Sequence, residues 1–298
     1  MIPVYVCYSM FGMQRTMDLV WAAGDQRSRG FLIGGTAGRT TLNGEGLQHE
    51  DGHSHILSGT VPNCVSYDPT FAYEVAVIVQ DGLRRMVAEQ QDVFYYLTVM
   101  NENYEHPELP AGSEANILKG MYQFKKGAAS NGARVQLLGS GTIFREAMAA
   151  AKLLQADWGV EADLWSCPSF NELARDGADC ERWNLLHPGD KLRVSHVTEC
   201  LNDTGGPVIV ATDYIRLFGE QIRALVPSGR SFTVLGTDGF GRSDTREKLR
   251  HFFEVDRYWI TLTALTALAN DGQFDKSKLL EAIKKYGLDA DKPNPISC

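Results

Sequence analysis

The sequence contains no run of about 18 apolar residues, the length a membrane-spanning helix needs, and no basic N-terminal stretch followed by an apolar one. It therefore predicts neither a membrane span nor a signal peptide. The six cysteines lie far apart, and no two of them form a CxxC pair. A chain of this size does not depend on disulfides, so we expect a reducing compartment, the cytoplasm, with an organelle matrix as the alternative.

Positive charge is also scarce, because 29 Lys and Arg face 37 Asp and Glu and the formal net charge is −8. An acidic chain with scattered cations binds a phosphate backbone poorly, so nucleic acid is not expected as a partner. The 298 residues are 44% apolar and 22% charged, which is typical of a soluble globular protein with room for two domains.

Apolar runs and helical periodicity alternate in the first part of the chain, and together they indicate a parallel α/β sheet covered on both faces. Strands are predicted at 4–6, 31–33 and 93–99, helices at 15–23 and 71–87, and a long Gly-rich loop at 34–59. Met1 is followed at once by IPVYV, which predicts a buried strand. The chain is therefore expected to start partway through a domain.

The same alternation returns in the second half of the chain. Strands are predicted at 134–138, 160–165, 207–211 and 232–235, with helices at 171–186 and starting near Thr142, Asp213, Ser243, Asp256 and Asp275. Between the two halves, Pro, Gly and Ser alternate with charged residues. We predict an N-terminal α/β domain at 1–111, a linker at 112–133 and a C-terminal α/β domain at 134–298.

Polar residues are unusually dense in the Gly-rich loop. His49, His53 and His55 lie among Glu45, Glu50 and Asp51. The three histidines could bind zinc or iron, although Gly52 excludes the helical spacing of an HExxH motif. A solvated loop without chemistry is a second possibility, and acid/base catalysis or substrate binding in a cleft is the favoured one.

Two further Gly-rich turns follow predicted strands. Residues 139–142 (GSGT) open a helix, but the third glycine of a dinucleotide fingerprint is missing. Residues 236–244 (GTDGFGRSD) lack the lysine of a phosphate loop. Tight strand-to-helix turns, capped by Thr142 and Ser243, explain both segments.

Four long motifs resemble the homodimeric pyruvate dehydrogenase E1 component of bacteria. They are YSMFGMQR, the run from DLVWAAGD to HEDGHSH, NCVSYDPTFAYEVAVIVQDGL and GTDGFGRSDTREKLRHFFEVD. ELARDGADCERWNLLHP extends the resemblance, which covers almost the whole chain. It implies the end of a thiamine-diphosphate-type pyrimidine-binding domain followed by a transketolase-like C-terminal α/β domain. The family's GDG…N diphosphate motif and the glutamate that protonates the cofactor's N1′ have no counterpart in this sequence.

The resemblance also implies roles for individual residues. Phe11 matches the aromatic residue that stacks on the aminopyrimidine ring of thiamine diphosphate, Tyr8 lines the same pocket, and Arg15 is a further pocket residue. Glu45 and His49 match the pair that reaches toward the substrate, where they position pyruvate and move protons. The Mg²⁺ ligands are expected outside this chain.

The activity implied is oxidative decarboxylation of pyruvate with acetyl transfer to the lipoyl group of E2, the dihydrolipoyl acetyltransferase. The implied assembly is a homodimer whose sites form between subunits. Because the diphosphate-binding residues are missing, we expect this chain alone to be inactive. The alternatives are a non-catalytic dimerisation or assembly module derived from E1, and a metal hydrolase using His49, His53 and His55.

Overall fold

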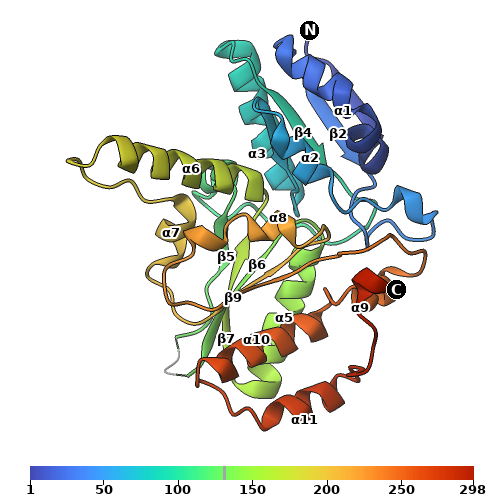
Figure 1. Ribbon diagram of the computed structural model, residues 1–298, viewed down its shortest axis with the longest axis vertical. Coiled ribbons are helices and arrows are strands. Elements are labelled where there is room, and N and C mark those ends of the chain that lie inside the picture. Colours follow the sequence, from blue (N-terminus) through green and yellow to red (C-terminus); the bar gives the residue numbers. More distant parts are fainter. Residues whose placement is uncertain (130–131) are drawn as a thin grey trace.

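The computed structural model of the chain describes residues 1–129 and 132–298. Within these residues the chain forms two open sheets, one of four strands and one of five, that lie in two lobes of the molecule (Figure 1). The fold is α/β with two sheets, as the sequence predicted. None of the described helices is long and apolar enough to cross a membrane.

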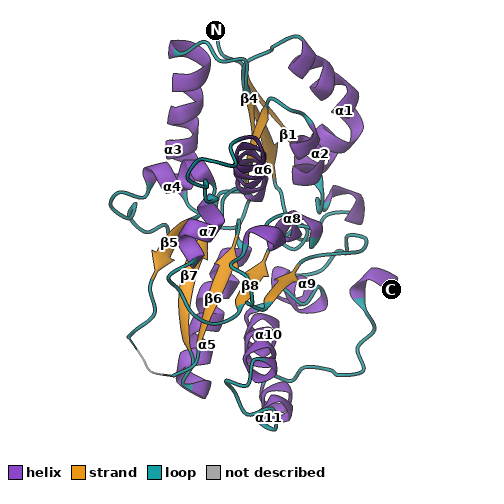
Figure 2. Ribbon diagram, turned by 60° about the vertical axis from the view of Figure 1, so that its left-hand side comes forward, coloured by secondary structure: helices purple, strands orange, loops and turns teal. Residues whose placement is uncertain are grey.

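The first sheet is parallel throughout and has the order β1-β2-β4-β3. Its strands are β1 (Val4–Tyr8), β2 (Phe31–Gly35), β3 (Cys64–Tyr67) and β4 (Phe94–Thr98). Helices α1 (Ser9–Asp25) and α2 (Ser54–Thr60) lie on one side, and α3 (Ala72–Leu83), which continues as the π-helical turn η2 (Arg84–Ala88), lies on the other (Figure 2). Alternate residues of β4 enter different cores, since Tyr96 packs with Met13 of α1 and Tyr95 with Ile78 of α3.

The second sheet has the order β5-β7-β6-β8-β9, and only β5 is antiparallel to its neighbour among the described strands. Its strands are β5 (Tyr122–Lys125), β6 (Arg134–Gly139), β7 (Glu161–Ser166), β8 (Val208–Ala211) and β9 (Phe232–Leu235). One face packs against α5 (Ile143–Trp158), α9 (Arg246–Phe252), α10 (Arg257–Asn270) and α11 (Lys278–Lys285). The other packs against α6 (Phe170–Leu186), α7 (His196–Leu201) and α8 (Leu217–Glu220).

Strand β1 lies at the edge of its sheet, and the prediction that it is buried is wrong for this chain. Among the described strands it pairs with β2 alone, and Val4 and Val6 are 63% and 65% exposed. Continuous apolar sequence predicts a strand correctly but does not reveal whether other elements cover it.

The predicted linker 112–133 is partly regular structure, which corrects its description as irregular chain. It contains α4 (Glu114–Lys119) and β5, while residues 130 and 131 lie outside the described part of the chain. A six-residue helix and a four-residue strand are too short to give a periodic signal, so the Pro, Gly and Ser content dominated the prediction. The boundaries of the two domains stay a prediction.

Several local predictions also differ from the structure. The Gly-rich segment 34–59 contains the 3₁₀ turn η1 (Leu47–His49) and α2. The helix expected from Asp213 is broken into α8 and η3 (Arg223–Leu225). Helix α9 begins after Thr245, which caps it in place of the predicted Ser243, and α11 begins after Ser277 rather than near Asp275, whereas α10 begins after Asp256 as predicted. The chain ends in η4 (Pro295–Ser297).

The turn before α5 is a tight strand-to-helix turn, but its side chains contact the first lobe rather than cap the helix. Ser140 Oγ donates to Asp68 Oδ2 over 2.8 Å, and Thr142 Oγ1 lies 2.6 Å from Thr41 Oγ1. Burial raises the pKa of Asp68 to about 7, against the effect of hydrogen bonds from Thr98 and Ser140. The polar residues of this turn therefore join the two lobes.

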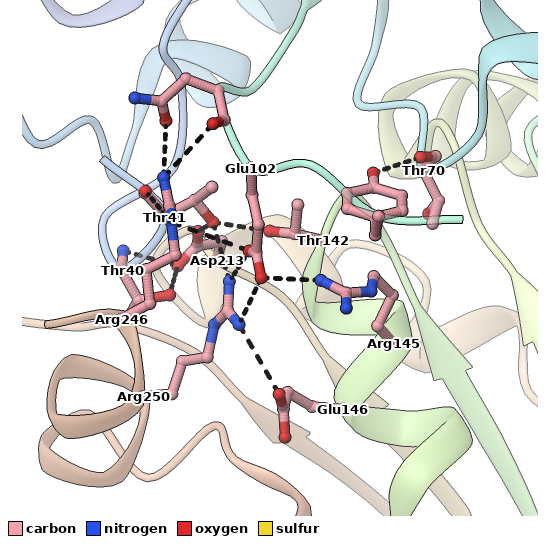
Figure 3. Close-up of polar contacts among 12 residues, drawn as sticks. Thr40, Thr41, Thr70, Glu102, Thr142, Arg145, Glu146, Asp213, Arg246 and Arg250 are labelled. Carbon is pink, nitrogen blue, oxygen red and sulfur yellow. Dashed lines mark hydrogen bonds and ion pairs between the residues drawn. The ribbon is translucent and has the colours of Figure 1, made fainter. Parts of the chain in front are cut away.

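Asp213, which follows β8, is the centre of this polar junction (Figure 3). Its buried carboxylate accepts hydrogen bonds from Thr40 N at 2.8 Å, Thr40 Oγ1 at 2.7 Å and Thr41 Oγ1 at 2.6 Å. Burial raises the pKa of Asp213, while Arg250 and the threonine hydrogen bonds act to lower it. A residue of the second lobe thus fixes the start of the Gly-rich loop.

Glu102 makes a second connection at the junction (Figure 3). Its carboxylate binds Arg145 at 2.7 Å and also Arg250, whose guanidinium lies 3.4 Å from Thr41 Oγ1. Arg246 Nε donates to the carbonyl of Thr41 over 2.7 Å. Helices α5 and α9 are in this way tied to the loop that follows β2.

Candidate functional site

Tyr8 and Phe11 lie where β1 ends and α1 begins. Tyr8 is the last residue of the strand, and Phe11 lies in the first turn of the helix. Their ring centroids are 6.0 Å apart, with an interplanar angle of 69°. The carboxyl end of a parallel strand is the usual place for a ligand in an α/β sheet, so this edge is a candidate site.

His49 reaches the same place from the loop that follows β2. It ends η1, and its imidazole centroid lies 5.0 Å from that of Tyr8 and 4.7 Å from that of Phe11, edge to face in both cases. Its Nδ1 is buried and has no hydrogen-bond partner among the described residues. The imidazole is therefore held by aromatic rings and keeps one nitrogen available.

Arg15 joins the cluster from one turn further along α1. Its guanidinium carbon lies 4.2 Å from the centroid of Phe11, in a cation–π arrangement. The arginine covers one face of the phenyl ring, so a planar ligand would stack on the other face or displace this exposed, flexible side chain.

Glu45 is the one predicted site residue that the structure does not bring into the cluster. It is exposed in the turn between two glycines, Gly44 and Gly46, four residues before His49. Gly44 has a φ of +72°, a conformation that suits glycine and reverses the chain there. The Tyr8, Phe11, Arg15 and His49 side chains thus form one group, and Glu45 lies on the adjoining exposed turn.

The three histidines of the loop do not converge on a common point. His53 Nε2 lies 3.2 Å from Gln14 Oε1, while His55 is buried, 2.9 Å from Thr98 Oγ1 and stacked on Phe218. Burial lowers the pKa of His55 to about 4, so its imidazole is neutral at pH 7. Within residues 1–129 and 132–298, no group of three or more His, Cys, Asp or Glu side chains is placed to hold a metal ion.

The loop is solvated only in part, because residues 44–48 are exposed whereas Glu50 and Asp51 are buried. Asp51 Oδ1 accepts the backbone N–H groups of His53 at 3.0 Å and Ser54 at 2.9 Å and so orders the start of α2. Burial raises the pKa of Glu50 to about 8, although the N–H of Arg242 and the charge of Arg39 act in the opposite direction. Sequence reasoning treated Glu50 only as one of several polar residues, and its isolation from water has no sequence signal.

Comparison with known families gives two matches that together cover most of the chain. Residues 1–107 match the family described as "Pyruvate dehydrogenase E1 component middle domain". Residues 120–256 match the family described as "Transketolase-like TK C-terminal domain". The first match contains the aromatic cluster, and the second contains the 236–244 loop.

The relatives named pyruvate dehydrogenase E1 component include proteins of three bacteria. The protein of Cupriavidus necator is 71% identical over 298 residues, which is 100% of this chain and 33% of the relative. The protein of Pseudomonas aeruginosa is 62% identical over 298 residues, which is 100% of this chain and 34% of the relative. That of Escherichia coli K12 is 58% identical over 99% of this chain and 33% of its own length. The chain therefore spans about a third of the length of the curated relatives it matches.

Solved structures with a similar fold are transketolases. The enzyme of Leishmania mexicana aligns with a TM-score of 0.68 at 17% identity, over 93% of this chain and 36% of its own. That of Campylobacter jejuni aligns with a TM-score of 0.65, also at 17% identity, over 89% and 35%. These likenesses support the transketolase-like fold, and the matched domains with the closely similar relatives show that this chain belongs to the pyruvate dehydrogenase E1 family.

Proposed function

We propose that this chain forms one wall of the active site of a thiamine-diphosphate-dependent pyruvate dehydrogenase E1. The reaction is the oxidative decarboxylation of pyruvate, with transfer of the acetyl group to the lipoyl group of E2. The observation that supports this most is the meeting of Tyr8, Phe11 and His49, from two segments of the chain, at the carboxyl ends of β1 and β2.

The residues present fit the aminopyrimidine half of the cofactor. The rings of Phe11 and Tyr8 offer apolar faces to a planar heterocycle, and His49 Nδ1 is an unpaired polar atom beside them. Thiamine diphosphate, when bound, supplies a nucleophilic carbon and an electron sink for the decarboxylation. Phe11 would stack on its pyrimidine, with Tyr8 bordering the pocket and Arg15 at its open side.

His49 and Glu45 are the residues through which this chain acts on the substrate. The imidazole of His49 would hydrogen-bond the substrate and give or accept a proton there, and its Nδ1, which is buried, has no competing partner among the described residues. Its two aromatic neighbours contact the ring edge to face and favour one orientation of it, which limits the positions this proton can take. Glu45, on its exposed turn, would approach the same point when the opposite wall of the site encloses it.

The chain spans only 33% and 34% of the length of its relatives, and we propose that the opposite wall, with the diphosphate and Mg²⁺ site, lies in the remainder of that length. We therefore propose that the chain by itself neither binds the cofactor tightly nor decarboxylates pyruvate. The functional assembly would be a homodimer in which the cofactor lies between the two walls, with E2 as the partner that accepts the acetyl group.

Calorimetric titration of this chain with thiamine diphosphate and MgCl₂ tests the first part of the proposal. We expect no binding in the micromolar range, because stacking on Phe11 and Tyr8 leaves the diphosphate without partners. Micromolar binding would contradict the proposal. The full-length relative from Cupriavidus necator serves as the positive control.

A chimera tests the second part. This chain replaces the matching, 71% identical segment of the Cupriavidus necator relative, and decarboxylation of pyruvate is measured. The chimera should be active, and His49→Ala should lower kcat by roughly 10²- to 10⁴-fold, the range for loss of a general acid or base. His187→Ala is the matched control, because His187 lies in the second lobe, where it stacks on Trp183 and its Nδ1 lies 2.9 Å from the carbonyl oxygen of Trp183. Equal activity of both variants would contradict the role of His49.

The exposed apolar residues near the N-terminus favour a second function, that of an assembly module. Val4, Tyr5, Val6, Leu19 and Trp21 are all exposed on β1 and α1. An apolar edge strand promotes association with another chain. Sedimentation velocity of the isolated chain tests this, since a monomer at micromolar concentration would contradict it.

A further inference from the structure

The Gly-rich loop 236–244 connects β9 to α9. Its sequence predicts a tight strand-to-helix turn. In the structure it crosses to the first lobe and contacts the segment that carries His49. Gly241 lies so close to this segment that a Cβ on it would be 2.9 Å from the Cβ of Glu50 and closer still to the carbonyl oxygen of Leu47. Only glycine fits at this crossing without movement of η1.

Glu50 makes the polar contact at the same crossing. Its Oε2 accepts the backbone N–H of Arg242 over 2.5 Å, and the side chain is 1% exposed. Arg39 adds a parallel contact, from its guanidinium to the carbonyl of Gly239. Two hydrogen bonds and a close backbone approach therefore join this loop to residues on both sides of η1.

His49 is the residue immediately before Glu50, so the position of its imidazole depends on where Glu50 is held. Its ring contacts Tyr8 and Phe11 edge to face, and no hydrogen bond to its Nδ1 fixes it among the described residues. Aromatic edges tolerate sliding more than hydrogen bonds do. The backbone of residues 47–50 must supply the missing restraint.

We propose that Glu50 is a positioning residue, which with Gly241 clamps η1 against the loop 236–244 and so holds the His49 imidazole between Tyr8 and Phe11. The catalytic role of this clamp rests on the proposed function, whereas the contacts of Glu50 and Gly241 that form it do not. The C-terminal domain thereby takes part in the site through Arg242 and Gly241, without presenting a side chain to it.

The protonation of Glu50 gives this clamp a pH dependence. The groups that face the carboxyl are Arg39 and Asp213, with Asp51 and Asp238 beyond Arg39 and His49 adjacent in sequence. Glu50 Oε1 has no partner among the described residues, so the ionised form leaves a buried charge that the N–H of Arg242 and the charge of Arg39 offset only in part. The neutral carboxyl therefore suits the contact between η1 and the loop 236–244, and this neutral form is favoured below a pH of about 8.

The test is the position of the His49 ring, followed by ¹H–¹³C NMR of this chain labelled in its seven histidines. His49→Gln assigns the signal. Ring currents from Tyr8 and Phe11 shift it in the wild type, and Glu50→Ala and Gly241→Ala should abolish that shift. Glu50→Gln, which keeps an acceptor oxygen for Arg242, should retain it. Exposed Glu247→Ala and unhindered Gly189→Ala are the matched controls.

The pH profile separates positioning from general stability. Between pH 7 and pH 9 the wild-type His49 signal should show a change, centred near the pKa of Glu50, that the Glu50→Gln signal lacks. The His55 signal, shifted by Tyr214 and Phe218, reports whether the fold is intact. An unchanged His49 shift in Glu50→Ala and Gly241→Ala overturns the proposal, and so does simultaneous loss of the His49 and His55 shifts. No cofactor is added, so the outcome is independent of thiamine diphosphate binding.

Discussion

Replacing Glu102 should destabilise the whole chain, because this carboxylate neutralises two arginines at the junction of the lobes. Glu102 is 15% exposed in its side chain and Arg250 only 6%. Truncation to alanine leaves Arg250 with two carboxylates, Glu146 at 3.6 Å and the nearby buried Asp213, whose charge also acts on it. Arg145 is 34% exposed and can be hydrated, so most of the cost comes from Arg250.

The expected loss follows from this geometry. Removing one partner of a buried ion pair typically costs about 3–5 kcal/mol. Because Glu146 still compensates part of the charge of Arg250, we expect Glu102→Ala to lower the free energy of unfolding by roughly 2–3 kcal/mol. The double variant with Arg250→Met should lose less than the sum of the two single changes, since no unpaired charge is left.

Urea denaturation followed by the fluorescence of the five tryptophans measures these differences. Burial alone would raise the pKa of Glu102, but hydrogen bonds and charges from Arg250 and Arg145 outweigh it and lower the pKa below 4.5. The stabilisation is therefore present above the unfolded-state pKa and lost as the pH falls, so the wild type and Glu102→Gln should converge in acid. A cost of Glu102→Ala below about 0.5 kcal/mol would refute the reasoning, because that is the range of ordinary surface changes.

Two other changes test single features of the fold. The folded-state pKa of His55 is about 4, below the ordinary 6.5, so the stabilisation from its neutral imidazole is fully present above pH 6.5 and is lost as the pH falls. Relative to His55→Gln, the wild type should lose on the order of 2 kcal/mol of unfolding free energy between pH 7 and pH 5, as measured by urea titration. An equal pH dependence of the unfolding free energy in the two proteins would contradict this. Asp256→Ala should cost about 1 kcal/mol, because its carboxylate caps α10 through the N–H groups of Tyr258 and Trp259; a thermal midpoint within error of the wild type would show that the cap adds nothing.

Elements with a strong local signal could be predicted from the sequence. Strands β4 and β8 are mostly apolar runs of five and four residues buried on both faces, and α5 has the periodicity of a helix packed on a sheet. Burial of β1 could not be predicted, because it depends on what lies beside the strand. Strand β5 was missed because its four residues include Gln123 and Lys125 and its place depends on pairing with β7.

The candidate site was predictable only through the family resemblance. No periodicity or spacing relates Tyr8 and Phe11 to His49, which lies 38 residues after Phe11, and the structure brings the three together. Glu50 could not be singled out, because its burial results from a loop almost 200 residues away in sequence, at Arg242. Local sequence carries no trace of such a contact.

Strand β5 belongs to both lobes at once, and this affects how the protein comes apart. It is hydrogen-bonded into the second sheet, yet Tyr122 packs in the core of the first lobe and donates to Glu74 over 2.7 Å. Melting either sheet alone would pull Tyr122 out of one of its two environments and leave the buried Glu74 short of a partner. The two lobes should therefore unfold as a single cooperative unit, and thermal denaturation should show one transition rather than two.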